Sequence, residues 1–483
     1  MKATGNWLEM HARFRPHAEA LHDVGTGRRW TYAALHHESL RWAGRLARAG
    51  VVAGDRVAVL AHNRGETLAI LFACAELGAC LLPMNWRLAD PELRWQLDHC
   101  TPRVVLADGE NLGRLGGLAL DEGCGDHAIE GPGATLEAPW VLMYTSGSTG
   151  KPKGAILTHR QVHWNAINTV LACDLAPGDA TLTFTPLFHT GGLNCLTTPL
   201  LHRGGRVVLT RGFEPAESLR LIQEERVSLL MGVPTIFQMM SDHPAFDATD
   251  LSSVRDALVG GAAIPLPLLH RWRARRIPLR QGFGLTEVGP NCFSLPPHRV
   301  DDKPGSVGLP IHHVAAKLVR PDGSECRADE PGELLLGGPA VCGGYWNDPA
   351  ATAACIRDGW FHTGDVLSRD ADGFFYVRGR IKEMYKSGGE NVYPPEVEAV
   401  LHACPGVALA AVIGVPDVRW GEVGRAFVEP APGAAVTPDA VRTFLDGKLA
   451  RFKLPKSVHV LAALPRTASG KVDRQALRAL EVP

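Results

Sequence analysis

The chain has 483 residues, of which 50 are Lys or Arg and 51 are Asp or Glu, so its formal net charge is −1. Apolar residues make up 45% and charged residues 21%, as in ordinary globular proteins. At roughly 150 residues per domain, this length predicts about three domains or sub-domains around a large core. The balanced charge excludes binding to nucleic acid or anionic lipid through bulk electrostatics, but it does not exclude a small, local anion site.

The sequence predicts a cytoplasmic protein without a transmembrane segment. Its first residues, MKATGNWLEMHARFRP, contain no apolar segment, so we expect neither a secretory signal nor an anchor. The longest uncharged run, residues 180–202, contains two prolines and a glycine pair that a membrane helix disfavours. Because the eleven cysteines form no CxxC pair, we expect reduced thiols rather than disulfides or a cysteine-rich zinc site.

Helical and strand patterns alternate along the first part of the chain. Thr31 is a helix cap, Gly50 ends that helix, and a buried strand is predicted at residues 56–60. Further helices are predicted at residues 68–77 and 215–225, and strands at residues 78–83, 104–107, 141–144, 207–209, 227–231 and 257–259. This alternation is typical of βαβ units with parallel sheets, which bind ligands near the carboxyl ends of their strands.

The pattern changes after about residue 305. Residues 316–319 and 333–336 flank a Pro-Asp-Gly turn and predict an antiparallel hairpin, with another strand at residues 374–377. The last hundred residues predict a helix at 395–402, a strand at 408–412 and a helix near 441–449. We therefore predict an α/β protein. A large N-terminal domain, residues 1–379, contains βαβ sub-domains and a small β-barrel-like part, and residues 380–483 form a small, mobile α+β domain.

A glycine-rich, hydroxyl-rich loop follows the predicted strand at residues 141–144. It reads TSGSTGKPKG over residues 145–154. Glycines let backbone N–H groups approach phosphate oxygens, hydroxyls donate to them, and lysines neutralise their charge. A Walker A loop would need GxxxxGK[ST], whereas here Thr145 replaces the first glycine and Pro152 follows the lysine. The loop therefore predicts a phosphate site of another kind.

The string YTSGSTGKPKG resembles the phosphate-binding signature of the adenylate-forming superfamily, which includes the acyl-CoA synthetases. Four further segments resemble motifs of that family in the right order: QGFGLTE (281–287), WFHTGD (360–365), GRIKE (379–383) and PRTASGK (465–471). The resemblance implies a ligase that converts a carboxylic acid, ATP and CoA into acyl-CoA, AMP and pyrophosphate through an acyl-adenylate. ATP, Mg²⁺ and CoA are the ligands it implies.

The resemblance also implies which residues bind ATP. Glu287 is the implied Mg²⁺ ligand, and Thr286 donates to phosphate. The implied β- and γ-phosphate contacts are Thr145, Ser146, Gly147, Ser148, Thr149, Gly150 and Lys153. The implied adenine and ribose contacts are Gly260, Gly261, Ala262, Gln281, Gly282, Phe283, Asp365 and Arg380. Phe283 stands where the family often has tyrosine, which keeps ring stacking and removes a phenolic hydrogen bond.

Two lysines and a CoA-binding face complete the implied site. Lys471 is expected to bridge the substrate carboxylate and the α-phosphate and to stabilise the charge that develops there. The small domain is expected to rotate about Lys382 after adenylation. The implied CoA contacts are Ser387, Gly388, Gly389 and Trp420.

The acyl pocket is expected near residues 186–193, 260–261 and 284–292, with His189 as a gate between the ATP and acyl sites. Relatives that activate amino acids have an aspartate after the phenylalanine that corresponds to Phe188, but here His189 follows. Because residues 180–202 contain no acidic side chain, an amino-acid substrate is disfavoured. Several apolar residues predict a fatty-acid or aromatic-acid pocket: Leu193, Ile236, Phe237, Val288 and Pro290.

We expect a fatty acid, and we keep two alternatives open. One is an aromatic acid–CoA ligase of the feruloyl or benzoyl type, and the other is an acyl-AMP ligase that loads a carrier protein. The sequence leaves open whether the protein forms a homodimer. No partner other than the carboxylic acid, ATP and CoA is implied.

Overall fold

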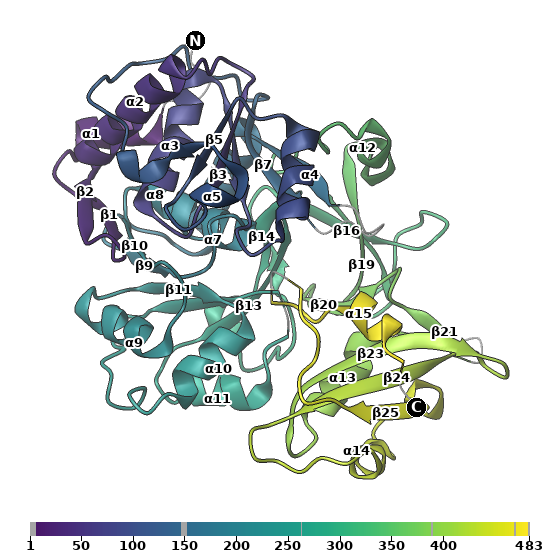
Figure 1. The fold of residues 1–483 in the computed structure, drawn as a ribbon. Coiled ribbons are helices and arrows are strands. Elements are labelled where there is room, and N and C mark those ends of the chain that lie inside the picture. The colour runs from purple at the N-terminus through teal and green to yellow at the C-terminus, as the bar shows by residue number, and fades with distance from the viewer. Residues whose placement is uncertain (1–5, 146–151, 262, 388–389, 468–469, 482–483) are drawn as a thin grey trace. The chain divides into compact units, whose positions relative to one another are not determined.

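The computed structural model describes residues 6–145, 152–261, 263–387, 390–467 and 470–481. The chain divides into two compact units, one comprising Met1–Ala316 with Leu336–His362 and the other Lys317–Leu335 with Thr363–Pro483. Figure 1 traces the chain through both units. The boundary predicted between residues 379 and 380 lies inside the second unit, and its role as a domain boundary stays a prediction.

A mostly parallel sheet forms the N-terminal part of the first unit. Its strands, in spatial order, are β6 (Leu118–Ala119), β5 (Val104–Ala107), β3 (Arg56–Leu60), β4 (Cys80–Met84), β7 (Pro139–Thr145) and β8 (Lys153–Thr158). Along β3, Val57 and Val59 pack in one core with helices α2 (Tyr32–Arg48) and α3 (Gly65–Leu77), whereas Ala58 and Leu60 pack with α4 (Asp90–Cys100). Both faces are buried, which explains the short apolar runs in the sequence.

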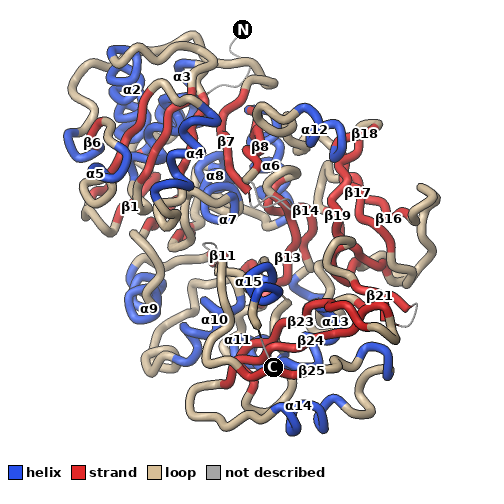
Figure 2. The backbone as a smooth tube through the Cα atoms, turned by 45° about the vertical axis from the view of Figure 1, so that its right-hand side comes forward, coloured by secondary structure: helices blue, strands red, loops and turns tan. Residues whose placement is uncertain are grey.

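A second sheet in the same unit brings together segments that are far apart in the sequence. Its spatial order is β15 (Leu309–Pro310), β14 (Gly289–Ser294), β13 (Leu279–Leu285), β12 (Asp256–Val259), β11 (Leu229–Gly232), β9 (Ala180–Thr183), β10 (Arg206–Leu209), β1 (Glu19–Asp23) and β2 (Arg28–Thr31). Helices α9 (Pro215–Glu224), α10 (Pro234–Asp242) and α11 (Leu266–Arg273) share one core with it, and α6 (His159–Ala172) and α8 (Thr197–Arg203) share another. Figure 2 shows the strands in red.

The remaining elements of the first unit are short. They are α1 (Trp7–Phe14), α5 (Leu112–Leu115), α7 (Thr190–Asn194), α12 (Pro349–Cys355), β18 (Ile356–Arg357) and the 3₁₀ turns η1 (Leu120–Glu122) and η2 (Pro297–Arg299).

The second unit contains two sheets. The first has β16 (Ala315–Val319), β17 (Gly332–Gly337), β19 (Trp360–Arg369) and β18 in that order, and β20 (Phe375–Arg380) also pairs with β19. The other has β22 (Glu390–Val392), β21 (Tyr385–Ser387), β24 (Gly421–Pro430) and β23 (Val407–Asp417) in that order, with β25 (Ser457–Val460) on β24. Helices α13 (Pro394–His402) and α14 (Pro438–Leu445) share a core with Val412, whereas α15 (Arg474–Ala479) packs with Ile413 on the opposite face. A 3₁₀ turn, η3 (Arg451–Lys453), precedes β25.

The predicted fold class is confirmed, and some element boundaries differ. The hydroxyl of Thr31 accepts a hydrogen bond from the Ala34 N–H and starts α2 as expected. The strand expected at 78–83 begins two residues later, because Gly78 adopts φ +68° and ends α3. None of the helices in the described part of the chain combines the length and the apolar character needed to cross a bilayer.

Candidate active site

Asp365 and Arg380 face each other across two antiparallel strands. They are register partners on β19 and β20, and Arg380 Nε donates to Asp365 Oδ1 at 2.8 Å. The Asp365 side chain is buried, and its other oxygen, Oδ2, has no partner among the described residues. Burial raises the pKa of Asp365, and the positive charge of Arg380 opposes that rise. A buried carboxylate with one free oxygen can accept a ligand hydroxyl, as the predicted ribose contact requires.

Lys471 lies in a short loop of the same unit. The loop is closed by an antiparallel bridge between Arg466 and Val472 and by the Thr467 N–H, which donates to the Lys471 carbonyl at 2.7 Å. Asp473 then caps α15 by accepting from two backbone N–H groups. These contacts fix the backbone at Lys471 and at the start of α15.

The charges around Lys471 connect it to the Asp365–Arg380 pair. Loss of water to the surrounding protein and the charge of Arg380 lower the pKa of Lys471, while Asp365 and Glu383 oppose this. The second unit therefore gathers two cations and a buried carboxylate, a set suited to a sugar–phosphate ligand.

Glu287 is held by a residue that the sequence motifs did not single out. Tyr345 donates its hydroxyl to Glu287 Oε1 at 2.9 Å, and the Glu287 carbonyl accepts from the Cys342 N–H at 2.7 Å. The ammonium of Lys153 lies 5.1 Å from the centre of the Tyr345 ring. Burial and the Glu287 charge raise the pKa of Tyr345, so the hydroxyl remains a donor at neutral pH. A carboxylate, a phenol and a lysine thus form one cluster in the first unit.

The predicted phosphate loop connects two paired strands. Thr145 and Lys153 are register partners at the ends of β7 and β8, and the Thr145 hydroxyl donates to the Lys153 carbonyl at 3.4 Å. The predicted contacts Ser146, Gly147, Ser148, Thr149 and Gly150 lie outside the described residues.

Strand register brings the predicted adenine segments together. Val259 on β12 pairs with Gln281 on β13, so the loop that begins at Gly260 lies beside Gly282. The Gln281 side chain already makes a hydrogen bond within the protein, because its Oε1 accepts from the Ile264 N–H at 3.1 Å. A methyl group added at Gly260 would meet open space. Gly261 adopts φ +82°, and Ala262 lies outside the described residues.

Phe283 and Thr286 occupy the antiparallel hairpin formed by β13 and β14. The Phe283 ring packs edge-on against Phe293, with 5.8 Å between the ring centres. Thr286 is buried, and its carbonyl accepts from Gln161 Nε2 at 2.9 Å.

His189 is exposed and caps α7. Its Nδ1 accepts from the Gly191 N–H at 3.2 Å, which requires Nδ1 to be unprotonated. The role of His189 as a gate stays a prediction.

The predicted hinge and CoA residues lie on the strands and turns of the second unit. Lys382 is exposed in the turn between β20 and β21, and Ser387 is buried at the end of β21. The Trp420 side chain is 41% exposed, and the guanidinium of Arg419 lies 4.8 Å from its ring centre. Gly388 and Gly389 lie outside the described residues. The contacts of these residues with CoA stay predictions.

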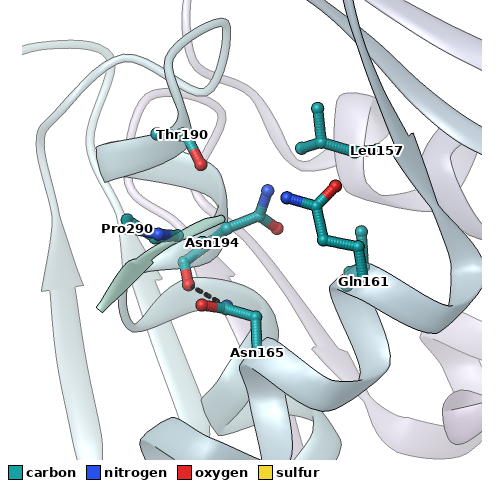
Figure 3. A pocket seen from close by; sticks show the side chains of 8 residues that line it. Leu157, Gln161, Asn165, Thr190, Asn194 and Pro290 are labelled. Atoms are coloured by element: carbon teal, nitrogen blue, oxygen red, sulfur yellow. Dashed lines mark hydrogen bonds between the residues drawn. The ribbon is translucent and has the colours of Figure 1, made fainter. Parts of the chain in front are cut away.

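A small pocket lies beside the hairpin of β13 and β14 (Figure 3). Its lining comes from β8, α6, α7 and the start of β14: Leu157, Gln161, Val162, Asn165, Thr190, Asn194, Gly289 and Pro290. Two segments expected to form the acyl pocket, residues 186–193 and 284–292, contribute to it. Gln161, Asn165 and Asn194 lie outside the segments expected for the acyl pocket, because nothing in their spacing distinguishes them from ordinary helix residues.

The two-unit α/β fold, the Asp365–Arg380 pair and the Glu287–Tyr345–Lys153 cluster fit the nucleotide-binding enzyme that the motifs predict. Residues 8–346 match the family of AMP-binding enzymes, and residues 396–471 match the AMP-binding enzyme C-terminal domain. The chain belongs to the AMP-binding enzyme family of the adenylate-forming superfamily, as its motifs predicted.

Similarity to known proteins extends over almost the whole chain. A feruloyl-CoA synthase from an Amycolatopsis species is 43% identical, with 98% of each chain covered. An indoleacetate–CoA ligase from Aromatoleum aromaticum is 39% identical over 98% of this chain and 97% of the relative. The solved structure of o-succinylbenzoate CoA synthetase from Bacillus subtilis with its acyl-adenylate intermediate gives a TM-score of 0.91 at 33% identity, with 99% of each chain covered.

The same Bacillus subtilis enzyme has been solved with ATP and magnesium, also with a TM-score of 0.91 and 33% identity, over 98% of this chain and 99% of that one. The chain is an AMP-forming acid–thiol ligase of the acid–CoA ligase class, with ATP and CoA as its cosubstrates.

Proposed function

We propose that this chain joins an aromatic carboxylic acid to CoA through an acyl-adenylate. The observation that carries the proposal is full-length similarity, at 43% and 39% identity, to enzymes named for feruloyl and indoleacetate groups, which are both aromatic. The fatty acid expected from the sequence has weaker support, and the aromatic alternative replaces it.

The small pocket in the first unit is lined in part by residues 186–193 and 284–292, the segments expected to form the acyl site. Its side chains leave no enclosed space for a ring. The aromatic assignment is therefore based on the relatives and not on the pocket.

The roles of the site residues are part of the proposal. Within the described residues, no group of three or more His, Cys, Asp or Glu side chains could hold a metal ion. By its place in the QGFGLTE motif, Glu287 would hold Mg²⁺ together with phosphate oxygens, an arrangement that suits this ion. Asp365 and Arg380 bind the ribose, and Lys471 neutralises charge at the α-phosphate and the acyl carboxylate. When bound, Mg²⁺ supplies neutralisation of phosphate charge.

The test measures pyrophosphate release and thioester formation with purified enzyme. Cinnamate, benzoate and indoleacetate derivatives are compared with saturated fatty acids of several lengths, each with ATP, Mg²⁺ and CoA. We expect kcat/KM to be at least 10-fold higher for the best aromatic acid than for the best fatty acid.

Two outcomes would contradict this function. A fatty acid turned over with the higher kcat/KM would overturn the aromatic assignment. Acyl-adenylate formation without thioester to CoA, but with transfer to a phosphopantetheinylated carrier protein, would assign the acceptor to the carrier instead.

A further inference from the structure

We propose that Asn63 is a positioning residue for the acid substrate, because its side chain holds the backbone of residues 185–187, which lead into His189. None of the sequence motifs includes Asn63. The inference rests on the predicted place of the acyl site, and within the proposed function it does not depend on whether the acid is aromatic.

Both polar groups of the Asn63 amide bind this short segment. Asn63 Nδ2 donates to the Thr185 carbonyl at 3.0 Å, and Asn63 Oδ1 accepts from the Leu187 N–H at 2.9 Å. A carbonyl and an N–H two residues apart are the groups that a strand offers to a parallel neighbour, so the amide binds as a neighbouring strand would. Asn63 is only 7% exposed, so water competes little for either hydrogen bond.

The backbone around Asn63 is also held, so its amide is ordered before the acid binds. Asn63 lies in the short connection between β3 and α3. The His62 N–H donates to Asp108 Oδ2 at 2.9 Å, and the Gly65 N–H donates to the buried carboxylate of Asp23 at 2.8 Å. Asn63 therefore stands between two anchored residues, an arrangement that preorganises its side chain.

The first turn of α7 packs tightly against the same segment. A methyl group added at Gly192 would lie 2.2 Å from the Pro186 carbonyl oxygen and 2.6 Å from the Thr185 carbonyl oxygen, so this approach requires glycine. The Gly192 carbonyl accepts from the Thr197 hydroxyl at 2.7 Å. The segment thus contacts both Asn63 and Gly192, which leaves it little freedom to shift.

The location of these contacts is one where α/β proteins bind ligands. β3 runs parallel to β4, and β9 runs parallel to β10. Asn63 follows the carboxyl end of β3, and Thr185 follows the carboxyl end of β9. Because ligands bind beyond the carboxyl ends of parallel strands, the sheet topology supports an acid site at this segment independently of the sequence motifs.

The two hydrogen bonds of Asn63 flank the turn that carries Phe188 and His189. The His189 N–H donates to the Pro186 carbonyl at 3.1 Å and closes this turn. Asn63 binds the residues immediately before and after Pro186, so a shift of the segment moves both side chains together. A misplacement of about 1 Å at a substrate-positioning group can cost about 100-fold in rate.

The test compares KM for the acid with KM for ATP in the wild type and in two variants, measured by pyrophosphate release with the acid that the wild type turns over best. Asn63→Asp keeps the shape and the acceptor for the Leu187 N–H, but it places a carboxylate oxygen against the Thr185 carbonyl. Asn63→Leu removes both hydrogen bonds. We expect KM for the acid to rise about 10-fold or more in each variant, and KM for ATP to stay within about 3-fold.

Thr181→Val is the matched control. Thr181 is a buried threonine of β9, the strand that leads into the segment, and its hydroxyl donates to the Leu229 carbonyl at 3.1 Å. The substitution removes a buried hydrogen bond to the backbone and should leave both KM values within about 2-fold. Tm is measured for every variant, because a purely structural Asn63 would lower Tm and the amount of active enzyme without separating the two KM values.

The outcomes distinguish this inference from the proposed function. Equal rises in both KM values, a fall in kcat alone, or a matching rise in KM for the acid in Thr181→Val would overturn the positioning role and leave the ligase function standing. The same holds if KM for the acid does not change in Asn63→Asp, which decides the test if Asn63→Leu does not fold. Preference of the wild type for a fatty acid would overturn the aromatic assignment and leave the role of Asn63 standing.

Discussion

At the scale of single residues, the site depends on pairs that orient a charged group. The Tyr345 hydroxyl donates to Glu287 Oε1 at 2.9 Å, and in the described part of the chain no hydrogen bond is made to Oε2, which can face a cation. A hydrogen bond of this kind holds the carboxylate in one rotamer before Mg²⁺ binds, so binding does not have to order the side chain. Tyr345 is therefore a positioning residue, because it acts through Glu287.

Tyr345→Phe keeps the ring near Lys153 and removes only the hydroxyl. We expect the Mg²⁺ concentration for half-maximal pyrophosphate release to rise about 10-fold, since the loss of such a partner costs about 10–100-fold in metal affinity or activity. Tyr376→Phe is the control, because Tyr376 also donates to a carboxylate, Asp370, at 3.2 Å in the second unit. A purely structural Tyr345 would change Tm without changing the Mg²⁺ requirement.

A second residue-scale prediction concerns Asp365→Asn. An amide keeps the shape but replaces one acceptor with a donor, so we expect KM for ATP to rise at least 10-fold. Asp370→Asn, in the same unit, should leave KM for ATP within about 2-fold. An unchanged KM in Asp365→Asn would contradict the ribose role.

At the scale of elements, charged side chains join strands that are distant in the sequence. Glu225, at the end of α9, pairs with Arg29 of β2 at 2.5 Å and with Arg206 of β10. Arg206 also reaches Glu19 of β1 at 3.2 Å. Burial opposes ionisation of Glu225, but hydrogen bonds from Arg29 and Arg206 outweigh it and lower the pKa of Glu225 to about 2.

This lowered pKa makes the stability of the first unit depend on pH. The pKa of Glu225 is lower in the folded state than its ordinary value of 4.5, so its contribution is complete above that pH and is lost as the pH falls toward 2. The difference corresponds to about 3 kcal/mol at most. We expect Glu225→Gln to lower the free energy of unfolding by about 1–3 kcal/mol at pH 7, and by progressively less below pH 4.5.

Urea unfolding at a series of pH values measures this effect. Glu224→Gln is the matched control, because Glu224 is exposed and pairs only with the neighbouring surface residue Arg220, for which we expect less than about 0.5 kcal/mol. Equal effects of the two substitutions would contradict the role of the Glu225 cluster.

At the scale of the whole molecule, each of the two units carries some of the predicted site residues. The first unit carries Glu287 and Lys153, and the second carries Asp365, Arg380 and Lys471. We expect adenylation to need residues from each unit, and we expect attack by the thiol on the adenylate not to need Lys471. Rotation about Lys382 between the two half-reactions stays a prediction that this division makes testable.

Lys471→Ala separates the two half-reactions. We expect pyrophosphate release to fall at least 100-fold, because a positive charge at the α-phosphate is lost. Conversion of presynthesised acyl-adenylate and CoA to thioester should remain within about 3-fold of the wild type. Lys456→Ala, which removes an exposed lysine of the same unit, is the control. Equal loss of both half-reactions in Lys471→Ala would contradict separate roles for the two units.

Much of the fold could be predicted because its signals are local. The cap at Thr31, the helix that became Pro215–Glu224 and the buried strand Arg56–Leu60 each depend on residues within one element. The hairpin of β13 and β14 was missed, because its antiparallel pairing within a parallel pattern depends on contacts made after the chain has folded.

The sequence by itself determined the family, the nucleotide chemistry and most of the candidate residues, because glycine, hydroxyl and lysine motifs keep their order and spacing along the chain. The tertiary structure alone decided which partners those residues have. Tyr345 reaches Glu287 across 58 positions, and Gln161 reaches Thr286 across 125. A charge of −1 and a few motifs carry no information about such pairs, since a hydrogen bond depends on distance in space rather than distance in sequence. The polar pocket beside Gly289 therefore emerged only from the folded chain.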